Sequence, residues 1–239
     1  MCFHYSLTLE RAEIEIQLGV HFDDDWSPVF HANGFSFLRM PVITQQKPGS
    51  IQLFHWGLIP HWIKTGVDAE KIRAQTLNAR SETVFEKPSF RSYIGSNRCL
   101  VIADGFFEWM DYKKKKYPHL IFFQDERLFC FGGISCSWTD TNTGEHLDTF
   151  SILTTDANPM MARIHNIKQR MPVIILPQLY SKWLSPELSK EEIRTFFDPY
   201  PEEQMRSHTI SNFITSRSQD SNMPEIRESY IYPELPALK

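Results

Sequence analysis

Residues 98–135 of the chain read RCLVIADGFFEWMDYKKKKYPHLIFFQDERLFCFGGIS, and this stretch decides the fold class. It consists of short apolar runs, rich in β-branched and aromatic residues, which predict β-strands. We expect these strands at 98–104, 106–112, 118–124 and 127–135. Turn-forming residues separate the runs, including the lysine-rich loop 113–116 and the pair Asp125-Glu126. Successive strands joined by such short connections indicate antiparallel sheet.

The remainder of the chain continues this pattern with a few short helices. Further strands are expected at 35–43, 51–57, 148–155 and 172–176. Helices are expected at 8–19 with Thr8 as N-cap, at 81–95 with a break at Pro88, at 178–184, and from Ser189 to Asp198. Ser189 and Glu192 match a capping box, whereas the alternation in residues 12–16 leaves a strand as an alternative there.

The order of these elements predicts the architecture. Because helices do not alternate regularly with strands, a parallel βαβ sheet is disfavoured. We predict an α+β fold, mainly antiparallel and barrel-like, with several short helices, in a single domain over residues 1–239. The segment 218–239 is punctuated by prolines, and we expect it to run over the surface as an extended tail.

Composition supports a packed core and gives an ambiguous electrostatic signal. The chain has 239 residues, of which 41% are hydrophobic, and this excludes global disorder. The net charge of −4 alone argues against a nucleic-acid-binding protein, because phosphate affinity comes from Lys and Arg. Residues 39–116, however, hold thirteen basic and seven acidic residues, a local charge of +6. This block predicts a basic surface near a functional site, unless it is an ordinary solvated surface.

Several classes of protein are disfavoured by what the sequence lacks. The four cysteines form no CxxC pair, and no histidines occur at zinc-ligand spacing, so we expect no disulfide framework, metal or cofactor. No run approaches the ~18 apolar residues of a membrane span, and the N-terminus lacks a signal-peptide pattern. We therefore expect a monomeric, cytoplasmic protein of the bacterial type, without a membrane partner.

Cys2 is the first candidate functional residue. A small residue after Met1 permits removal of the initiator methionine, which would leave an α-amine and a thiol on Cys2. Their ordinary pKa values, about 8 and about 8.5, make both groups partly nucleophilic near neutral pH. Such a 1,2-aminothiol condenses with an aldehyde to a Schiff base and then closes to a thiazolidine. The alternative is a terminal cysteine without a role.

Polar residues in two further segments could act beside it. Asn78 and Arg80 could hold a phosphate, since guanidinium binds phosphate in a bidentate manner; the alternative is a turn that leads into a helix. Glu108 lies among aromatic residues, which would raise its pKa and suit it to acid–base work. The alternative for Glu108 is a strand-edge carboxylate in water.

His165, Arg170 and Trp62 are weaker candidates. A lone histidine such as His165 is more often a hydrogen-bonded structural residue than a catalytic one. Trp62 follows a Gly/Pro turn and, if exposed, could stack on an unpaired base, although such tryptophans more often belong to the core.

Five segments in order resemble one known family. They are Met1-Cys2, WGLIPHW at 56–62, NARSE at 78–82, DGFFEW at 104–109 and IHNIKQRMPVIIL at 164–176. Together they resemble the SOS-response-associated peptidase (SRAP) family, whose members sense abasic sites in single-stranded DNA. The resemblance departs at Phe3 and His4, where family members commonly have Gly and Arg.

The resemblance implies a fold with a basic groove for single-stranded DNA and a covalent bond between Cys2 and the sugar aldehyde of an abasic site. By motif, Asn78 would position the cysteine and the sugar, Glu108 would act as acid and base, and His165 would transfer protons near the sugar. Arg80, Trp62 and Arg170 would contact the DNA.

Two other functions stay open on the sequence alone. A thiol peptidase would use Cys2 as nucleophile and His165 as base, acting mainly on its own N-terminus. A single-strand-binding module would hold DNA without any covalent bond.

Overall fold

The stretch 98–135 forms strands in the structure, as predicted. The computed structural model describes residues 2–123, 125, 127–216 and 220–236. The stretch contributes β7 (Arg98–Ala103), β8 (Gly105–Tyr112), β9 (Lys115–Phe123) and the start of β10 (Phe129–Thr139). β8 pairs with β9 and β7 with β10, all antiparallel. Residues 124 and 126, which belong to the expected strand end and turn, lie outside the described residues.

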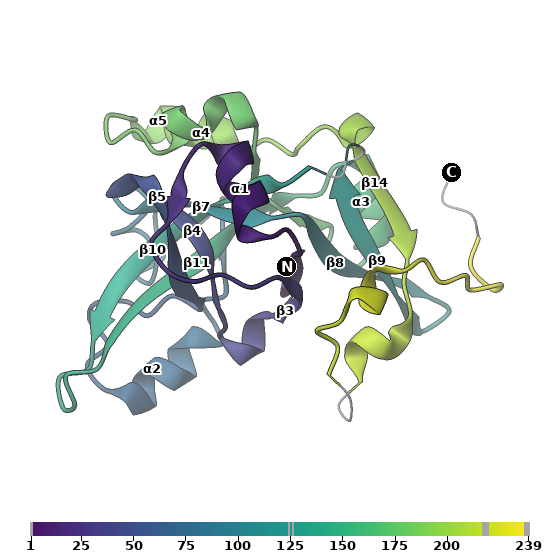
Figure 1. Cartoon of the computed structure of the whole chain (residues 1–239), viewed down its shortest axis with the longest axis horizontal. Helices are drawn as coiled ribbons and strands as arrows, with labels where there is room; N and C mark the ends of the chain where they lie inside the picture. The colour runs from purple at the N-terminus through teal and green to yellow at the C-terminus, as the bar shows by residue number, and fades with distance from the viewer. Residues whose placement is uncertain (1, 124, 126, 217–219, 237–239) are drawn as a thin grey trace.

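A closed barrel occupies one half of the molecule (Figure 1). Strands β11, β10, β7, β4 and β5 are neighbours in that order, and a pairing of β11 with β5 closes the ring. The closing pair is parallel, whereas the other pairs of the ring are antiparallel. The bounds of the other strands of this sheet are β4 (Arg39–Thr44), β5 (Lys47–Trp56), β11 (His146–Asp156), β2 (His21–Phe22), β6 (Asn78–Arg80), β12 (Arg170–Pro172) and β13 (Ile174–Ile175). The predicted α+β, mainly antiparallel and barrel-like fold is therefore confirmed.

A second sheet packs beside the barrel. Its strand order is β14-β9-β8-β1-β3, with the additional bounds β1 (His4–Leu7), β3 (Val29–Asn33) and β14 (Met205–Thr209). The chain passes from the barrel into this sheet at Asp104, between β7 and β8. Buried Asp104 accepts hydrogen bonds from Ser6 Oγ and Arg227 Nη1, both at 2.7 Å. These bonds hold β1 beside β8 at the junction of the two sheets.

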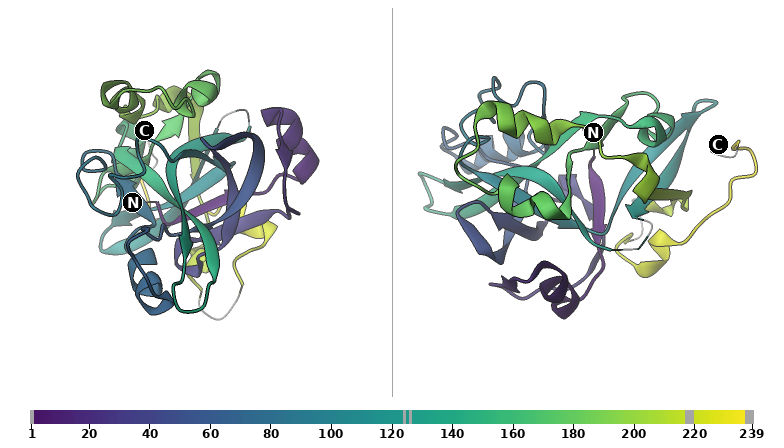
Figure 2. Two further views of the ribbon diagram at one scale, coloured as in Figure 1. Left: turned by 90° about the vertical axis from the view of Figure 1, so that its left-hand side faces the viewer. Right: turned by 90° about the horizontal axis from the view of Figure 1, so that it is seen from above.

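Short helices lie around the sheets (Figures 1 and 2). They are α1 (Arg11–Leu18), α2 (Gly66–Arg73), α3 (Pro159–Ile164), α4 (Tyr180–Trp183) and α5 (Lys190–Arg194). Figure 1 shows α4 and α5 on one side of the barrel and α2 on the opposite side. Among the described residues, no helix is long and apolar enough to cross a membrane.

Two helix predictions need correction. The first helix begins at Arg11, because Glu10 is its N-cap and forms a capping box with Glu13. Thr8 is instead drawn to the buried Asp104 carboxylate, to which its N–H and hydroxyl donate at 2.7 and 2.5 Å. Residues 81–95 form successive turns rather than helices. By contrast, the capping box of Ser189 and Glu192 is confirmed at the start of α5.

The C-terminal segment packs against the second sheet. Its described part, residues 220–236, includes a 3-10 turn at Pro224–Arg227 and a bridge between Ile210 and Ser229. Ile226 of that turn is buried. The rest of the expected tail, residues 218, 219 and 237–239, lies outside the described residues.

Candidate functional site

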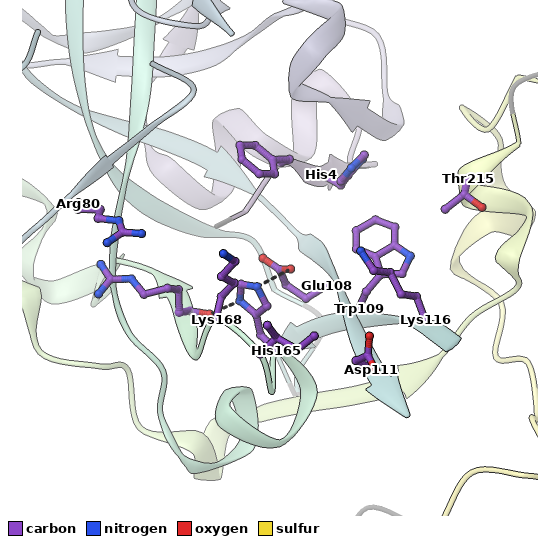
Figure 3. A pocket seen from close by; sticks show the side chains of 12 residues that line it. His4, Arg80, Glu108, Trp109, Asp111, Lys116, His165, Lys168 and Thr215 are labelled. Atoms are coloured by element: carbon purple, nitrogen blue, oxygen red, sulfur yellow. Dashed lines mark hydrogen bonds and ion pairs between the residues drawn. The ribbon is translucent and has the colours of Figure 1, made fainter. Parts of the chain in front are cut away.

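A cavity of about 450 Å³ opens where the second sheet meets β6, β12 and the end of α3. It is lined by Phe3, His4, Arg80, Glu108, Trp109, Asp111, Lys116, His165, Ile167, Lys168, Arg170 and Thr215. In Figure 3, Glu108 and His165 lie at its centre, with Arg80 and Lys168 to one side and Trp109 and Lys116 to the other. The cavity thus brings together four of the seven predicted site residues.

The register of β1 against β8 brings Cys2 to this place. Tyr5 pairs with Phe106 in antiparallel register. The chain that runs back from Tyr5 to Cys2 therefore lies beside the chain that runs forward from Phe106 to Trp109. Cys2 itself is fully buried, and the residues that follow it, Phe3 and His4, line the cavity.

Asn78 holds the Cys2 backbone. Its Nδ2 donates a hydrogen bond to the Cys2 carbonyl oxygen at 2.9 Å, across 76 positions of sequence. Asn78 lies on β6, which pairs in parallel with β11, so the alternative of a simple turn into a helix is wrong. The Asn78 Oδ1 atom is buried and has no hydrogen-bond partner among the described residues. Asn78 therefore retains an acceptor beside Cys2.

Burial changes the acid–base properties of Cys2 and Glu108. Burial, and then the charge of Glu108, raise the pKa of the Cys2 thiol well above its ordinary range. In the folded chain, burial therefore favours the protonated form of the Cys2 thiol near neutral pH. Burial also raises the pKa of Glu108 to about 8. With only 5% of its surface exposed, Glu108 is not the solvated strand-edge carboxylate of the alternative interpretation.

His165 lies opposite Glu108, at the C-terminal end of α3. Its Nε2 lies 3.8 Å from Glu108 Oε2, and its Nδ1 lies 2.9 Å from the Arg170 carbonyl oxygen. Since a carbonyl only accepts, Nδ1 carries the hydrogen and Nε2 of the neutral ring faces the carboxyl group. Burial lowers the pKa of His165 to about 4. At neutral pH, a protonated Glu108 thus faces a neutral His165.

Arg170 is held by carboxylates rather than left free. Its guanidinium pairs with Glu82 and, at 2.8 Å, with Asp156, and it donates to the Thr154 carbonyl at 2.7 Å. Its side chain is only 7% exposed. These contacts give Arg170 a structural role at the cavity wall, where two acids already offset its charge.

The other two candidates are exposed. Arg80 follows Asn78 on β6 and lines the cavity. Trp62 is 44% exposed, so the core interpretation of this residue is wrong, but it is not among the residues that line the cavity.

The basic block 39–116 is spread over the molecule. Arg80 and Lys116 line the cavity, whereas Arg39 and Lys47 form ion pairs with Asp24 and Asp23. The cavity gains further positive charge from Lys168, which lies outside that block. Segregation of charge along the sequence therefore does not give one basic face.

Sequence reasoning missed the aromatic wall of the cavity. His4 packs edge-on against Trp109, with ring centroids 4.8 Å apart. Side chains alternate along β8: Phe106 joins the main core, while Phe107 and Trp109 pack in a second cluster. Because side chains alternate along a strand, Glu108 and Trp109 point to opposite faces of β8. The sequence pattern therefore did not predict that Glu108 and Trp109 would line the same cavity. Among the described residues, no group of His, Cys, Asp and Glu is arranged to hold a metal ion.

Comparisons with known proteins identify the family of the chain. A family model described as SOS response associated peptidase (SRAP) matches residues 1–217. The abasic site processing protein YoqW of Bacillus subtilis is 35% identical over 235 residues, covering 96% of this chain and 100% of the relative. The abasic site processing protein HMCES of Gallus gallus is 33% identical over 70% of this chain and 54% of its own length.

Solved structures show the same fold. A crystal structure of a protein from Bacteroides thetaiotaomicron superposes with a TM-score of 0.91 at 39% identity, covering 96% of this chain and 100% of that one. A protein from Bordetella bronchiseptica superposes with a TM-score of 0.75 at 22% identity, covering 88% of this chain and 100% of that one. On the match of the family model and the likeness to these relatives, the chain belongs to the SOS response associated peptidase (SRAP) family.

Proposed function

We propose that this protein captures abasic sites in single-stranded DNA by forming a covalent thiazolidine through Cys2 after removal of Met1. The observation that carries the proposal is a cavity lined by Glu108 and His165, next to a buried Cys2 whose carbonyl oxygen accepts a hydrogen bond from Asn78. Relatives named abasic site processing proteins supply the substrate class. The protein would act as a monomer in the bacterial-type cytosol, associated with the nucleoid when bound to DNA.

The chemistry begins at the α-amine of Cys2. The amine nitrogen adds to the aldehyde carbon of the ring-opened sugar and gives a carbinolamine, which loses water to form an iminium ion. The Cys2 sulfur then bonds to the iminium carbon while the thiol proton leaves, and the C=N electron pair passes to nitrogen. The Asn78 hydrogen bond to the Cys2 carbonyl would fix the amine, and the available Oδ1 would accept from it.

Glu108 and His165 would move the protons in these steps. With a pKa of about 8, Glu108 is mostly protonated at pH 7 and can donate to the departing hydroxyl group. The resulting carboxylate can then accept the thiol proton. A proton acceptor is needed because the raised pKa of the Cys2 thiol keeps it protonated. Neutral His165 would accept a proton at Nε2 near the sugar hydroxyl.

Several cationic and aromatic side chains would hold the strand. Exposed Arg80, which lines the cavity, would bind a backbone phosphate. Trp62 would stack on a flanking base further along the strand. Arg170, whose charge is already paired, would act on DNA mainly by keeping this wall in place.

A denaturing gel tests the proposal. Protein with Met1 removed is incubated with single-stranded DNA that carries one abasic site, under reducing conditions. We expect a shifted band that is absent for Cys2→Ala and for DNA without the abasic site. Absence of a Cys2-dependent band would exclude covalent capture.

The same preparation separates the two other functions. Repeated cleavage of an added peptide would favour a thiol peptidase, whereas stoichiometric modification would not. Salt-sensitive DNA binding without any adduct would favour a simple binding module.

A further inference from the structure

A hydrogen-bonded chain of side chains leads from the cavity to the C-terminal segment. His4, which lines the cavity, places Nδ1 2.8 Å from Nε2 of His31. His31 in turn places Nδ1 2.6 Å from Oγ of Ser221, across 190 positions of sequence. His31 is buried and Ser221 is partly exposed. The chain therefore joins the cavity to solvent through a buried imidazole.

Aromatic packing and backbone contacts fix this arrangement. The His4 and His31 rings are stacked with centroids 5.1 Å apart. The edge of His4 meets Trp109, and His31 makes an edge contact with Phe107 at 5.5 Å. The neighbour of Ser221, Asn222, accepts a hydrogen bond from the His31 N–H at 3.2 Å. These contacts fix the positions of the His4 and His31 rings from several sides.

Proton positions along this chain are coupled. Burial lowers the pKa values of His4 and His31 to about 3 and about 4, so both rings are neutral at pH 7. Each neutral ring carries one N–H and one lone pair, so the two contacts can run in either direction. In one direction His4 Nε2 is left as an acceptor, and in the other it is left as a donor. Among the described residues, no hydrogen-bond partner is found for His4 Nε2.

We propose that His4, His31 and Ser221 form a proton relay that serves the reaction at Cys2. The proposal rests on the proposed function, and it adds a second route for protons beside Glu108 and His165. It assigns a role to His4, one of the two positions at which the chain departs from the residues common in the family.

The relay conserves protons at each link. A proton from the cavity binds His4 Nε2 as the hydrogen on Nδ1 passes to His31 Nε2. The hydrogen on His31 Nδ1 passes to Ser221 Oγ, and the original hydroxyl hydrogen of Ser221 leaves to bulk water. Ring closure releases one proton from the thiol, and the relay carries it out to water. Dehydration of the carbinolamine consumes one proton, and the relay would deliver it by the same transfers in the reverse direction.

Variants at Ser221 and His31 test the relay without changing the groups at Cys2. Ser221→Thr keeps the hydroxyl, whereas Ser221→Val has a similar shape without it. His31→Gln retains a donor and an acceptor but does not pass a proton on. The rate of adduct formation is measured at saturating single-stranded abasic DNA, at pH 7 in H2O and in D2O. Affinity for the same DNA is measured with each variant combined with Cys2→Ala.

We expect His31→Gln to slow adduct formation roughly 10–100-fold and Ser221→Val about 3–10-fold, with Ser221→Thr close to wild type. The D2O effect should shrink in the two slow variants, and DNA affinity should change less than about twofold. His146→Gln, at an exposed histidine on β11, is the matched control.

Equal rates for all these variants, or a slow rate explained entirely by weaker DNA binding, would overturn the relay. A wild type that forms no Cys2-dependent adduct would instead overturn the proposed function, so the two failures are distinguishable.

Discussion

Glu108 Oε2 and His165 Nε2 lie 3.8 Å apart, and burial shifts the pKa values of the two groups in opposite directions. Each shift favours the neutral form, so the buried pair is a carboxylic acid beside a neutral imidazole at pH 7. The pair therefore gives the cavity a hydrogen-bond donor, the carboxyl group of Glu108, beside an acceptor, Nε2 of His165.

Glu108→Gln should slow adduct formation about 10²–10⁴-fold, because the amide keeps the shape but cannot transfer a proton. In the wild type, the rate should fall as the pH rises through about 8, where Glu108 loses its proton. The variant should lack that decline. Single-turnover rates between pH 6 and pH 9.5 measure both effects. If the rate of the variant still falls above pH 8, the titration of another group causes the decline.

The same substitution should stabilise the fold at alkaline pH. The folded-state pKa of Glu108 lies above its unfolded value, so its protonated form contributes stability at low pH that is lost as the pH rises through about 8. Glu108→Gln removes this loss. We expect the melting temperature to rise by roughly 5 °C at pH 9 and to change little at pH 4. Thermal unfolding followed by circular dichroism checks this, and equal shifts at both pH values would contradict it.

Arg80→Ala should weaken non-covalent binding of single-stranded DNA without affecting stability. Arg80 is exposed on a short strand, so its loss leaves no buried charge. Measured in the Cys2→Ala background, affinity should fall about 3–10-fold and the salt slope should decrease by about 1. An unchanged salt slope would show that Arg80 does not contact phosphate.

Arg170→Met should act chiefly on stability. Removing this guanidinium leaves Glu82 and Asp156 without their shared partner and the Thr154 carbonyl without a donor. We expect a loss of about 2–3 kcal/mol in the free energy of unfolding by urea. Arg163→Ala, which breaks an exposed pair with Glu202, should cost less than about 1 kcal/mol. A fully stable Arg170→Met variant that binds DNA poorly would favour a direct contact instead.

The sequence predicted the elements whose signals are local. The strands of 98–135 and the Ser189 capping box depend on neighbouring residues, and both are present. The parallel pairing of β5 with β11 joins residues almost a hundred positions apart, so no local pattern indicates that the barrel closes there. Thr8 failed as an N-cap for the same reason, because Asp104, 96 positions away, binds it.

For the site, residue chemistry and the family resemblance suggested the candidate residues, and the aromatic neighbours of Glu108 predicted its raised pKa. The types of Cys2 and Glu108 suggested an aminothiol and an acid, whereas the burial that sets their pKa values depends on how the two sheets meet. The pairing of Arg170 with Glu82 spans 88 positions, and the contact between His31 and Ser221 spans 190. Such contacts can be found only once the fold is known.

The intact mass of the denatured protein–DNA adduct is the most direct test for a thiazolidine at Cys2. With Met1 removed, we expect a species whose mass is the sum of protein and abasic DNA less one water, stable without a reducing agent. Cys2→Ser keeps the amine but not the thiol, and should give an adduct only after trapping with borohydride. A wild-type adduct that also requires trapping, or no adduct from protein that lacks Met1, would exclude a thiazolidine at Cys2.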